Sequence, residues 1–320
     1  MKKLTIADTA RYLQEKDRFL ILTHRRPDGD TLGSAAALCL GLRQLGKTAF
    51  VLENPEITPK YKFLLEDLTK KEAELTDTLV AVDIASKSML PLQYAALAEQ
   101  IALRIDHHGT AESFTEAELV VPEAAACGQL IYDLLIQMGA VLDVALANAL
   151  YTAVSTDTGC FRYANTQSHT FTVAAACAAV SPDLYRLNQL LFETNSLARL
   201  RIQGWMVENA QFLQQGQVCI CALPLAVENQ IGVTEDDMEN ISALPRTIDG
   251  VKIAATLRQE RDTGKIKLSV RALPQYDAGA ICAKFGGGGH KGAAGASLAM
   301  SMDEAVQAFI QALPVIGMDN

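Results

Sequence analysis

Acidic and imidazole side chains gather directly after short apolar segments in the first half of the chain. These segments, FLILT, TLVAV and IALRI, are typical of buried strands. The polar side chains that follow them, or that follow a predicted helix near residue 155, are His24, Asp28, Asp30, Asp83, Asp106, His107, His108 and Asp157. Carboxylates brought close together repel one another unless cations neutralise them. Oxygen and imidazole ligands without thiolate favour Mn²⁺ or Mg²⁺.

Each of these residues alone has a simpler explanation. Asp30 could cap a helix, Asp83 could accept hydrogen bonds from backbone amides, and Asp157 could cap a turn. The recurrence of one chemical type at one kind of position favours a shared site instead. The four aspartates at 28, 30, 83 and 157 carry a charge of −4, which two divalent cations balance. Two metals about 3.5–4 Å apart can activate water and clamp a phosphoryl group.

The elements that must position these side chains alternate between strand and helix. Strands are predicted at 19–24, 48–53, 78–83 and 101–106, and helices at 31–46, 123–139, 144–159 and 165–180. Gly139 is expected to cap the second helix, and Asn165 or Thr166 to open the fourth. Such alternation predicts an α/β domain with a mostly parallel sheet covered by helices. The carboxyl ends of parallel strands form the crevice where ligands bind.

A second, smaller mixed α/β domain is predicted after a polar helical stretch at 181–215, which contains the single tryptophan. Strands are expected at 217–225, 251–260 and 265–273, the last two forming a hairpin. Helices are expected at 234–244, 278–285 and 302–313. The predicted domains are 1–185 for metal binding and catalysis, 186–215 as a helical linker, and 216–320 for substrate binding.

The composition and charge of the chain favour a folded protein and argue against disordered, membrane-spanning and secreted classes. The chain has 320 residues, 49% of them hydrophobic and 20% charged, which is typical of a folded protein and not of disorder. Its net charge of −9 disfavours a surface that tracks long duplexes. Apolar stretches are too short to span a membrane, and no secretory signal is expected at the N-terminus. Seven cysteines without a C-x-x-C pair are expected to be reduced. The predicted location is the cytoplasm.

A glycine-rich loop in the second domain could bind an anion. Four glycines at 286–289 expose backbone amides, His290 and Lys291 add cationic donors, and Arg271 can hold a phosphate. The alternative is a flexible turn after a helix. The predicted substrate-binding residues are Arg271, Gly287, Gly288, Gly289, His290 and Lys291.

Five motifs in this order resemble those of the DHH phosphoesterases. HRRPDGDTLGS (24–34), VAVD (80–83), RIDHHGT (104–110) and STDTGCFRYANT (155–166) resemble the four motifs of the catalytic domain. GGGGHKGAAGAS (286–297) resembles the signature of the DHH-associated C-terminal domain. Length and arrangement are most similar to family members that act both as oligoribonuclease and as phosphatase of 3′-phosphoadenosine 5′-phosphate (pAp).

The resemblance assigns roles to the clustered residues. It implies one Mn²⁺ on His24, Asp28, Asp83 and Asp157, and a second on Asp30, Asp83 and His107, with Mg²⁺ as the alternative metal. A hydroxide between the metals would attack the phosphate in line. His108 would stabilise charge on the phosphate or act as a further ligand. Asp106 would orient a neighbouring histidine.

The activity implied is Mn²⁺-dependent hydrolysis of very short RNA or DNA oligonucleotides to mononucleotides, together with dephosphorylation of pAp. Alternatives are a phosphodiesterase of linear or cyclic dinucleotides, such as pApA, and a non-catalytic nucleotide-binding regulator. Cyclic-dinucleotide members carry sensory and membrane segments for which we expect no room before His24. Arg25 and Arg26 could contact phosphate or simply be exposed to solvent. Residues 161–163 could stack on a base or pack in the core. The oligomeric state stays open between monomer and homodimer.

Overall fold

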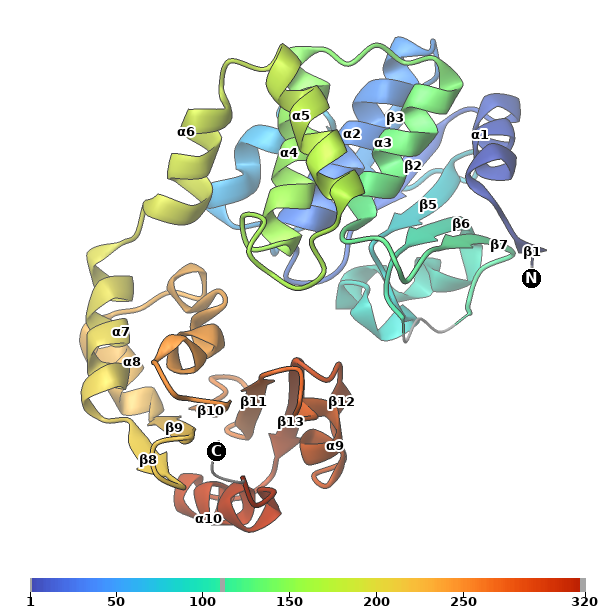
Figure 1. Ribbon diagram of the computed structural model, residues 1–320. Coiled ribbons are helices and arrows are strands. Elements are labelled where there is room, and N and C mark those ends of the chain that lie inside the picture. The colour runs from blue at the N-terminus through green and yellow to red at the C-terminus, as the bar shows by residue number, and fades with distance from the viewer. Residues whose placement is uncertain (1, 110–112, 317–320) are drawn as a thin grey trace. The chain divides into compact units, whose positions relative to one another are not determined.

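The computed structural model describes residues 2–109 and 113–316, so Thr110 of the third motif lies outside the described residues. The chain forms two compact units, Met1–Thr194 and Asn195–Asn320, which we describe separately (Figure 1). Most of the predicted linker 186–215, namely residues 195–215, groups with the second unit, because helix α7 (Leu197–Glu208) buries Ile202 and Met206 in that unit's core. No helix in the described ranges is long and apolar enough to cross a membrane.

The first unit is built on a seven-stranded sheet in which every pairing is parallel, as the sequence predicts. Its strand order is β1-β7-β6-β5-β2-β3-β4. The strands are β1 (Lys2–Lys3), β2 (Phe19–Leu22), β3 (Ala49–Leu52), β4 (Thr69–Lys70), β5 (Thr78–Val82), β6 (Ile101–Asp106) and β7 (Ala117–Val120). The chain leaves β2 toward β3 and β4, and later returns to β5 on the other side of β2. This reversal makes the β2–β5 border a topological switch point, where ligands bind in open parallel sheets.

The α-helices cover one face of this sheet, and the short 3-10 helices η2 (Lys87–Met89) and η3 (Leu92–Gln100) cover the other (Figure 1). The α-helices are α1 (Ile6–Glu15), α2 (Gly29–Gln44), α3 (Cys127–Met138), α4 (Val144–Asp157), α5 (Ser168–Val180) and α6 (Leu184–Asn188). A further 3-10 helix, η1 (Pro59–Leu64), and a short π-helix, η4 (Gln189–Glu193), pack on the same side as the α-helices. Phe19 and Ile21 of β2 pack under the α-helices, whereas Leu20 and Leu22 pack toward η2 and η3. Burial on both faces explains the continuous apolar strand segments.

Local details of the first unit correct some expectations. The fourth predicted helix, α5, is capped by Gln167 and not by Asn165 or Thr166, because Gln167 forms a capping box with Thr170. Gly139 caps α3 with φ of 86°, as predicted. Helix α1 and three strands, β1, β4 and β7, are not predicted from the sequence. β1 and β4 have only two residues each, too few to show a hydrophobic period.

The second unit carries a mixed six-stranded sheet in the order β12-β13-β11-β10-β9-β8. The strands are β8 (Gln211–Leu213), β9 (Val218–Leu223), β10 (Ile253–Gln259), β11 (Ile266–Ala272), β12 (Gly288–Gly289) and β13 (Ala293–Leu298). Its helices after α7 are α8 (Leu225–Ile231), α9 (Ala278–Ala283) and α10 (Met302–Ala312). β10 and β11 pair antiparallel, which confirms the predicted hairpin. α9 and α10 pack on one sheet face, against alternate residues such as Ala255 and Leu268.

The prediction of a helix at 234–244 is wrong. Two short 3-10 turns, η5 (Asp236–Met238) and η6 (Ile241–Thr247), stand in its place. Asn240 separates them with a left-handed backbone, φ 54°, which an α-helix does not accommodate. Asp237 also accepts hydrogen bonds from the backbone and hydroxyl of Thr234, which fixes a tight turn before the segment. The resulting segment lies over the sheet face opposite α9 and α10.

Candidate metal centre

The predicted ligands meet at the carboxyl ends of β2, β5 and β6. His24 follows β2, Asp83 directly follows β5, and His107 directly follows β6. Asp28 caps α2, where its carboxylate accepts hydrogen bonds from the backbone N–H groups of Asp30 and Thr31. Asp157 is the last residue of α4. The topology thus brings four separate segments to the switch point of the sheet.

Two imidazoles point their Nε2 atoms at the carboxylates. Nδ1 of His24 lies 2.8 Å from the carbonyl oxygen of Arg25, and Nδ1 of His107 lies 3.1 Å from that of Ala124. A carbonyl only accepts, so these contacts place the proton on Nδ1 of the neutral rings and leave Nε2 with its lone pair. Nε2 of His24 lies 3.6 Å from Asp28 Oδ1 and 3.7 Å from Asp83 Oδ2. Backbone carbonyls orient metal-binding histidines in this way.

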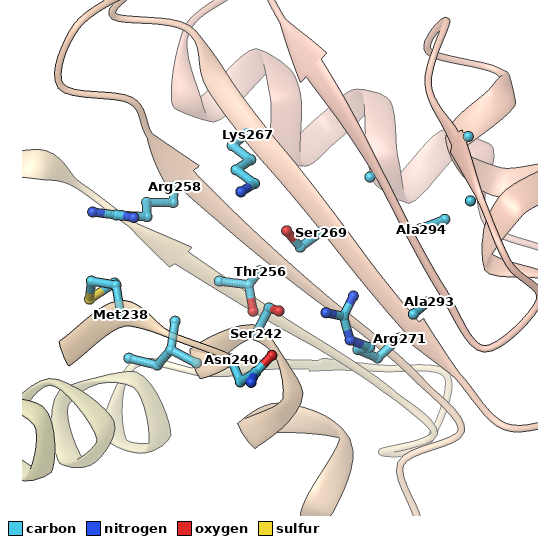
Figure 2. Close-up of a pocket in the computed structure, with 14 residues that line it drawn as sticks. Met238, Asn240, Ser242, Thr256, Arg258, Lys267, Ser269, Arg271, Ala293 and Ala294 are labelled. Atoms are coloured by element: carbon cyan, nitrogen blue, oxygen red, sulfur yellow. The ribbon is translucent and has the colours of Figure 1, made fainter. Parts of the chain in front are cut away.

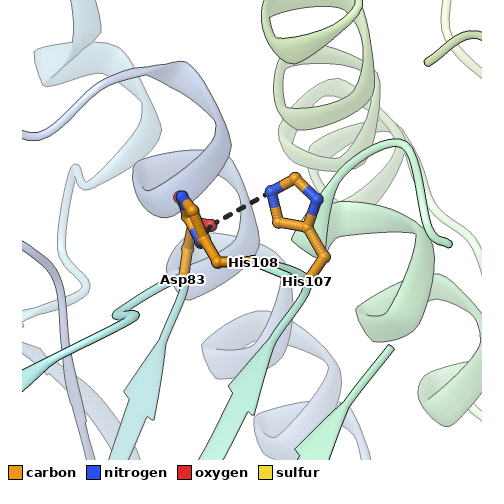
Figure 3. A group of neighbouring side chains, drawn as sticks. All are labelled: Asp83, His107 and His108. Carbon is orange, nitrogen blue, oxygen red and sulfur yellow. Dashed lines mark ion pairs between the residues drawn. The ribbon is translucent and has the colours of Figure 1, made fainter. Parts of the chain in front are cut away.

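Asp83 lies at the centre of the group. Its Oδ1 atom is 3.4 Å from Nε2 of His107 and 3.6 Å from Nδ1 of His108 (Figure 3). The residue is buried, and within the described chain its Oδ1 atom has no hydrogen-bond partner. Its backbone is left-handed, with φ of 59°, which is strained for a residue other than glycine. A buried carboxylate oxygen without a donor is the kind of atom that a cation would satisfy.

Three subsets of these side chains have ligand atoms within 4.8 Å of one another. They are His24, Asp28 and Asp83; Asp30, His107 and Asp157; and Asp83, His107 and His108. Asp157 therefore lies with Asp30 and His107, and its Oδ2 is 3.7 Å from Nε2 of His107. The resemblance had implied that Asp157 shares a metal with His24 and Asp28. Each subset offers oxygen and imidazole donors without thiolate, the donor set of a hard divalent cation.

Close helix packing holds Asp30 in place. Its carboxylate accepts hydrogen bonds from the backbone N–H groups of Cys127 and Gly128 at the start of α3, at 2.7 and 3.0 Å. It also accepts one from the Ser34 hydroxyl at 3.0 Å. Gly33, one turn into α2, lies so near α4 that a Cβ atom there would be 2.5 Å from the Ala149 carbonyl oxygen. The motif glycine thus allows α2 and α4 to bring Asp30 and Asp157 together.

The electrostatics of the cluster show a shortage of positive charge. Burial and the charge of Asp83 raise the pKa of Asp30 well above its ordinary value, and burial raises the pKa of Asp157 to about 7. Burial opposes protonation of His24, but the carboxylates of Asp28 and Asp83 outweigh it and raise its pKa to about 9. Both kinds of group therefore hold protons more firmly than usual. A divalent cation in their place would supply the missing charge.

Asp106 supports the neighbouring histidines from a buried position. Its Oδ1 accepts hydrogen bonds from the backbone of His107 at 2.9 Å and from Nδ1 of His108 at 2.8 Å. Burial alone would raise the pKa of Asp106, but its hydrogen bond with His108 lowers it. Arg104 lies 3.8 Å from Asp106 and 2.6 Å from Glu118. Asp106 thus stays charged and holds one imidazole in a fixed orientation.

The segment after Asp157 contains residues that the sequence analysis assigned to a helix cap or left open. Asn165 donates from Nδ2 to the Asp157 carbonyl at 3.2 Å and to its carboxylate at 3.4 Å, so it positions a candidate ligand. Phe161 stacks with Phe171 at a ring-centroid distance of 5.5 Å and packs against the core of the first unit. Tyr163 is half exposed. Only the family motif could have pointed to Asn165, because nothing in its local sequence marks it.

The second unit has a polar pocket of about 420 Å³ on the sheet face opposite α9 and α10 (Figure 2). Of the predicted substrate-binding residues, Arg271, Gly288 and Gly289 line it. Gly287, His290 and Lys291 are not among its described lining residues. Its remaining wall comes from β10, β11, β13 and residues 238–242. The strands β10 and β11 were predicted, but the contribution of residues 238–242 was not, because that segment was expected to be a helix.

Packing explains much of the glycine-rich loop. A Cβ atom on Gly287 would lie 2.1 Å from the Gly295 carbonyl oxygen, and one on Gly289 would lie 2.6 Å from that of Ala293. These two glycines are needed for β12 to approach β13. Gly288, in contrast, has nothing within 4 Å of its Cβ position and faces the pocket. Gly286 also has nothing within 4 Å of its Cβ position, but its φ of 73° favours glycine, so Gly288 is the one of the four for which neither packing nor backbone conformation requires glycine.

Both units of the chain are similar to known protein families. Residues 18–154 match the DHH family, N-terminal domain, and residues 215–314 match the DHHA1 domain. The chain is 33% identical to the bifunctional oligoribonuclease and PAP phosphatase NrnA of Thermus thermophilus, over 92% of this chain and 88% of that protein. It is 28% identical to the cyclic-di-AMP phosphodiesterase GdpP of Geobacillus thermodenitrificans, over 94% of this chain and 48% of that protein. An exopolyphosphatase-related protein from Bacteroides fragilis shares the fold, with a TM-score of 0.82 at 23% identity over 96% of this chain and 94% of that chain.

Proposed function

This chain belongs to the DHH family, with a DHHA1 domain as its second unit, and on that premise we propose that it is a metal-dependent phosphoesterase. Its substrates are short oligoribonucleotides, which it hydrolyses to mononucleotides, and pAp, from which it removes the 3′-phosphate. The observation that carries the proposal is the convergence of candidate ligands on Asp83, whose buried oxygen lacks a partner in the described chain. The 33% identity to a relative named for these two activities supports the choice of substrates.

The donor set fits two divalent cations, with Mn²⁺ as the proposed metal. His24, Asp28 and Asp83 would hold one, and Asp30, Asp83, His107 and Asp157 would hold the other. Bound there, the cations would supply positive charge to the phosphate and lower the pKa of water. Asp83 would contact both, because its two oxygens face different histidines, Oδ2 toward His24 and Oδ1 toward His107.

His108 supplies a proton beside the same carboxylates. Burial lowers the pKa of His108, but its hydrogen bond with Asp106 and the charge of Asp83 outweigh burial and raise it. Asp106 occupies Nδ1, so the second proton of the charged ring is at Nε2. We propose that Nε2–H donates to a phosphate oxygen as negative charge develops there. Asp106 acts by fixing the ring, and Asn165 by holding Asp157.

The second unit binds the nucleotide. Arg271 and Lys267 bring cationic side chains to the pocket, and Gly288 leaves its floor open. Arginine holds phosphate through paired donors, so Arg271 is the main anion contact. Truncation of Arg271 to methionine should raise KM for pAp about tenfold or more and leave kcat nearly unchanged. His290 and Lys291 stay predicted contacts, as neighbours of the glycine loop.

A second candidate function is hydrolysis of dinucleotides, which the similarity to a cyclic-di-AMP phosphodiesterase favours. The chain spans about half of that relative's length, so similarity does not extend to its other half. Linear pApA and cyclic di-AMP offer the same phosphodiester to the metal centre. Linear substrates have a free terminal phosphate for Arg271, which cyclic ones lack, so the linear form is the better dinucleotide substrate.

A substrate panel tests the proposal. The full chain is incubated with RNAs of two to twenty nucleotides, pAp, pApA and cyclic di-AMP, with Mn²⁺, with Mg²⁺ and with chelator. We expect release of mononucleotides from the shortest RNAs and of phosphate from pAp, only with metal. Failure to release either product at any metal concentration would refute the proposal, and nucleotide binding without hydrolysis would favour a regulator. Weak action on long duplexes, a homodimeric state and a cytoplasmic location stay predictions.

A further inference from the structure

We propose that the pocket of the second unit recognises ribose hydroxyl groups and thereby selects RNA nucleotides over DNA nucleotides. This inference rests on the proposed function, because it names the part of the substrate that the pocket distinguishes. The residues that carry it are Asn240, Ser242, Thr256 and Ser269.

These four neutral polar side chains line the pocket from two directions (Figure 2). Thr256 on β10 and Ser269 on β11 are cross-strand neighbours and share the sheet face that forms the pocket. Asn240 lies between η5 and η6, and Ser242 lies in the first turn of η6. Within the described chain, none of the four side chains makes a hydrogen bond. Thr256 is only 3% exposed, and its Oγ1 is a buried atom without a partner.

Of the four side chains, Thr256 is the unusual one, because it is buried and its hydroxyl has no partner, whereas Ser242 and Ser269 are partly exposed and Asn240 is exposed. More than nine-tenths of buried polar groups in proteins have a hydrogen-bond partner, and exceptions need a reason. Here the reason would be a ligand that completes the hydrogen bonds when it enters the pocket.

The chemistry of the wall fits ribose better than a base. Hydroxyl groups both donate and accept, as the 2′-hydroxyl of RNA does, and that group distinguishes RNA from DNA. No aromatic ring is among the residues that line the pocket, so no stacking platform for a base is present there. An enzyme that degrades mixed sequences must tolerate every base. Hydrogen bonds to the 2′-hydroxyl would select RNA over DNA without selecting any base sequence.

The rest of the pocket leaves room for a sugar and its phosphate. Gly288 pairs with Gly295 in the sheet, so two residues without side chains lie side by side on the pocket floor. Lys267 and Arg271 lie two positions before and two positions after Ser269 in β11, so the three side chains share one face of the sheet. A phosphate held by either cation would therefore place its ribose near the Ser269 and Thr256 hydroxyls.

Two measurements on the full chain test the inference. The first is binding of AMP and of 2′-deoxy-AMP with chelator present, by calorimetry, which does not depend on catalysis. The second is kcat/KM for pApA and for its deoxy counterpart with Mn²⁺. We expect the wild type to favour the ribose form in both. Thr256→Val and Ser242→Ala should each reduce that preference about five- to tenfold, as expected for one hydrogen bond, through dissociation constant and KM and not through kcat.

Controls separate this inference from the proposed function. Ser297→Ala removes a hydroxyl from β13 outside the pocket and should leave the preference unchanged. Thr256→Val should be no less stable to heat than the wild type, because it removes a buried hydroxyl without a partner. Bis(p-nitrophenyl) phosphate has no ribose, so its Mn²⁺-dependent turnover tests the metal centre alone.

Several results would overturn the inference. Equal binding of AMP and 2′-deoxy-AMP would do so, and so would pocket variants that lose affinity for both equally, since the wall would then contact base or phosphate. If bis(p-nitrophenyl) phosphate is turned over in these cases, the proposed function stands. A ribose preference that disappears in the variants, without any Mn²⁺-dependent hydrolysis, would support the pocket and refute the proposed function.

Discussion

Two buried acids, one in each unit, have opposite surroundings. Glu228 in α8 is 0% exposed, and both of its oxygens are satisfied: Arg258 binds each of them, at 2.5 and 3.0 Å, and Arg261 binds one at 3.1 Å. Asp83 is 2% exposed, and its neighbours are imidazoles at 3.4–3.7 Å and further carboxylates. One acid is neutralised by its own chain, and the other is not.

This difference separates a structural charge from a functional one. A buried carboxylate with two arginines needs nothing from outside, and removing it leaves buried cations unpaired. A buried carboxylate surrounded by other acids is complete only with added cations. We therefore expect substitution of Glu228 to affect stability and substitution of Asp83 to affect activity. Measurements of activity and stability on variants of both acids test this contrast.

The largest expected effect is on catalysis by Asp83→Asn. The substitution removes the charge at the centre of the proposed metal pair and keeps the shape of the side chain. Bound metals supply several kcal/mol of transition-state stabilisation, so kcat for pAp should fall by about a thousandfold or more. Steady-state kinetics over a range of Mn²⁺ concentrations would measure this fall.

The same variant should fold at least as stably as the wild type in chelator, because the substitution relieves repulsion from Asp30 and Asp157. Urea unfolding without metal measures this. A variant that keeps most of its activity, or that loses activity only because it unfolds, would place Asp83 among the structural acids and remove the contrast with Glu228.

Glu228→Gln should have the opposite result. Breaking a buried, hydrogen-bonded ion pair destabilises a protein by about 3–5 kcal/mol; here Arg258 and Arg261 would lose their buried anion and keep only the exposed Glu235. Urea unfolding would show this loss. Turnover of bis(p-nitrophenyl) phosphate by the folded variant should stay near the wild-type value. Glu235→Gln is the matched control: Glu235 contacts the same arginines from an exposed position, with 59% of its side chain accessible, so its loss should be about 1 kcal/mol or less.

The sequence predicted the acid cluster well and the ion-pair cluster not at all. An apolar segment followed by polar residues indicates the end of a buried strand. His24, Asp83 and His107 could therefore be assigned to one edge of the sheet from the sequence alone. Glu228 and Arg258 are 30 residues apart and lie in a helix and a strand. Nothing local distinguishes such a pair from solvated charges. The local sequence also failed to predict the pocket wall. A helix was expected at 234–244, but Asn240 has a left-handed backbone and separates two short 3-10 helices there.

Metal addition should stabilise only the protein that retains the acid cluster. A ligand at a hundred times its dissociation constant raises the free energy of unfolding by about 2.7 kcal/mol. Thermal unfolding of the wild type should therefore shift upward with Mn²⁺, and the shift should disappear in Asp83→Asn. Glu228→Gln should unfold at a lower temperature but keep its Mn²⁺-dependent shift. An equal shift in Asp83→Asn would mean that Mn²⁺ binds elsewhere.

The smallest effect concerns a third acid, Asp237, which fastens the segment that forms the pocket wall. Burial alone would raise its pKa, but hydrogen bonds from Ser196 and Thr234 lower it below its ordinary value of 3.8. Its charged form is therefore the stabilising one, and its contribution is present above about pH 5 and disappears as the pH falls through the lowered folded-state pKa. Asp237→Asn should be about 1 kcal/mol less stable than the wild type at pH 7, and this difference should shrink toward pH 3. Urea unfolding of both proteins across this range measures it, and a difference that stays constant with pH would show that Asp237 acts through packing instead of charge.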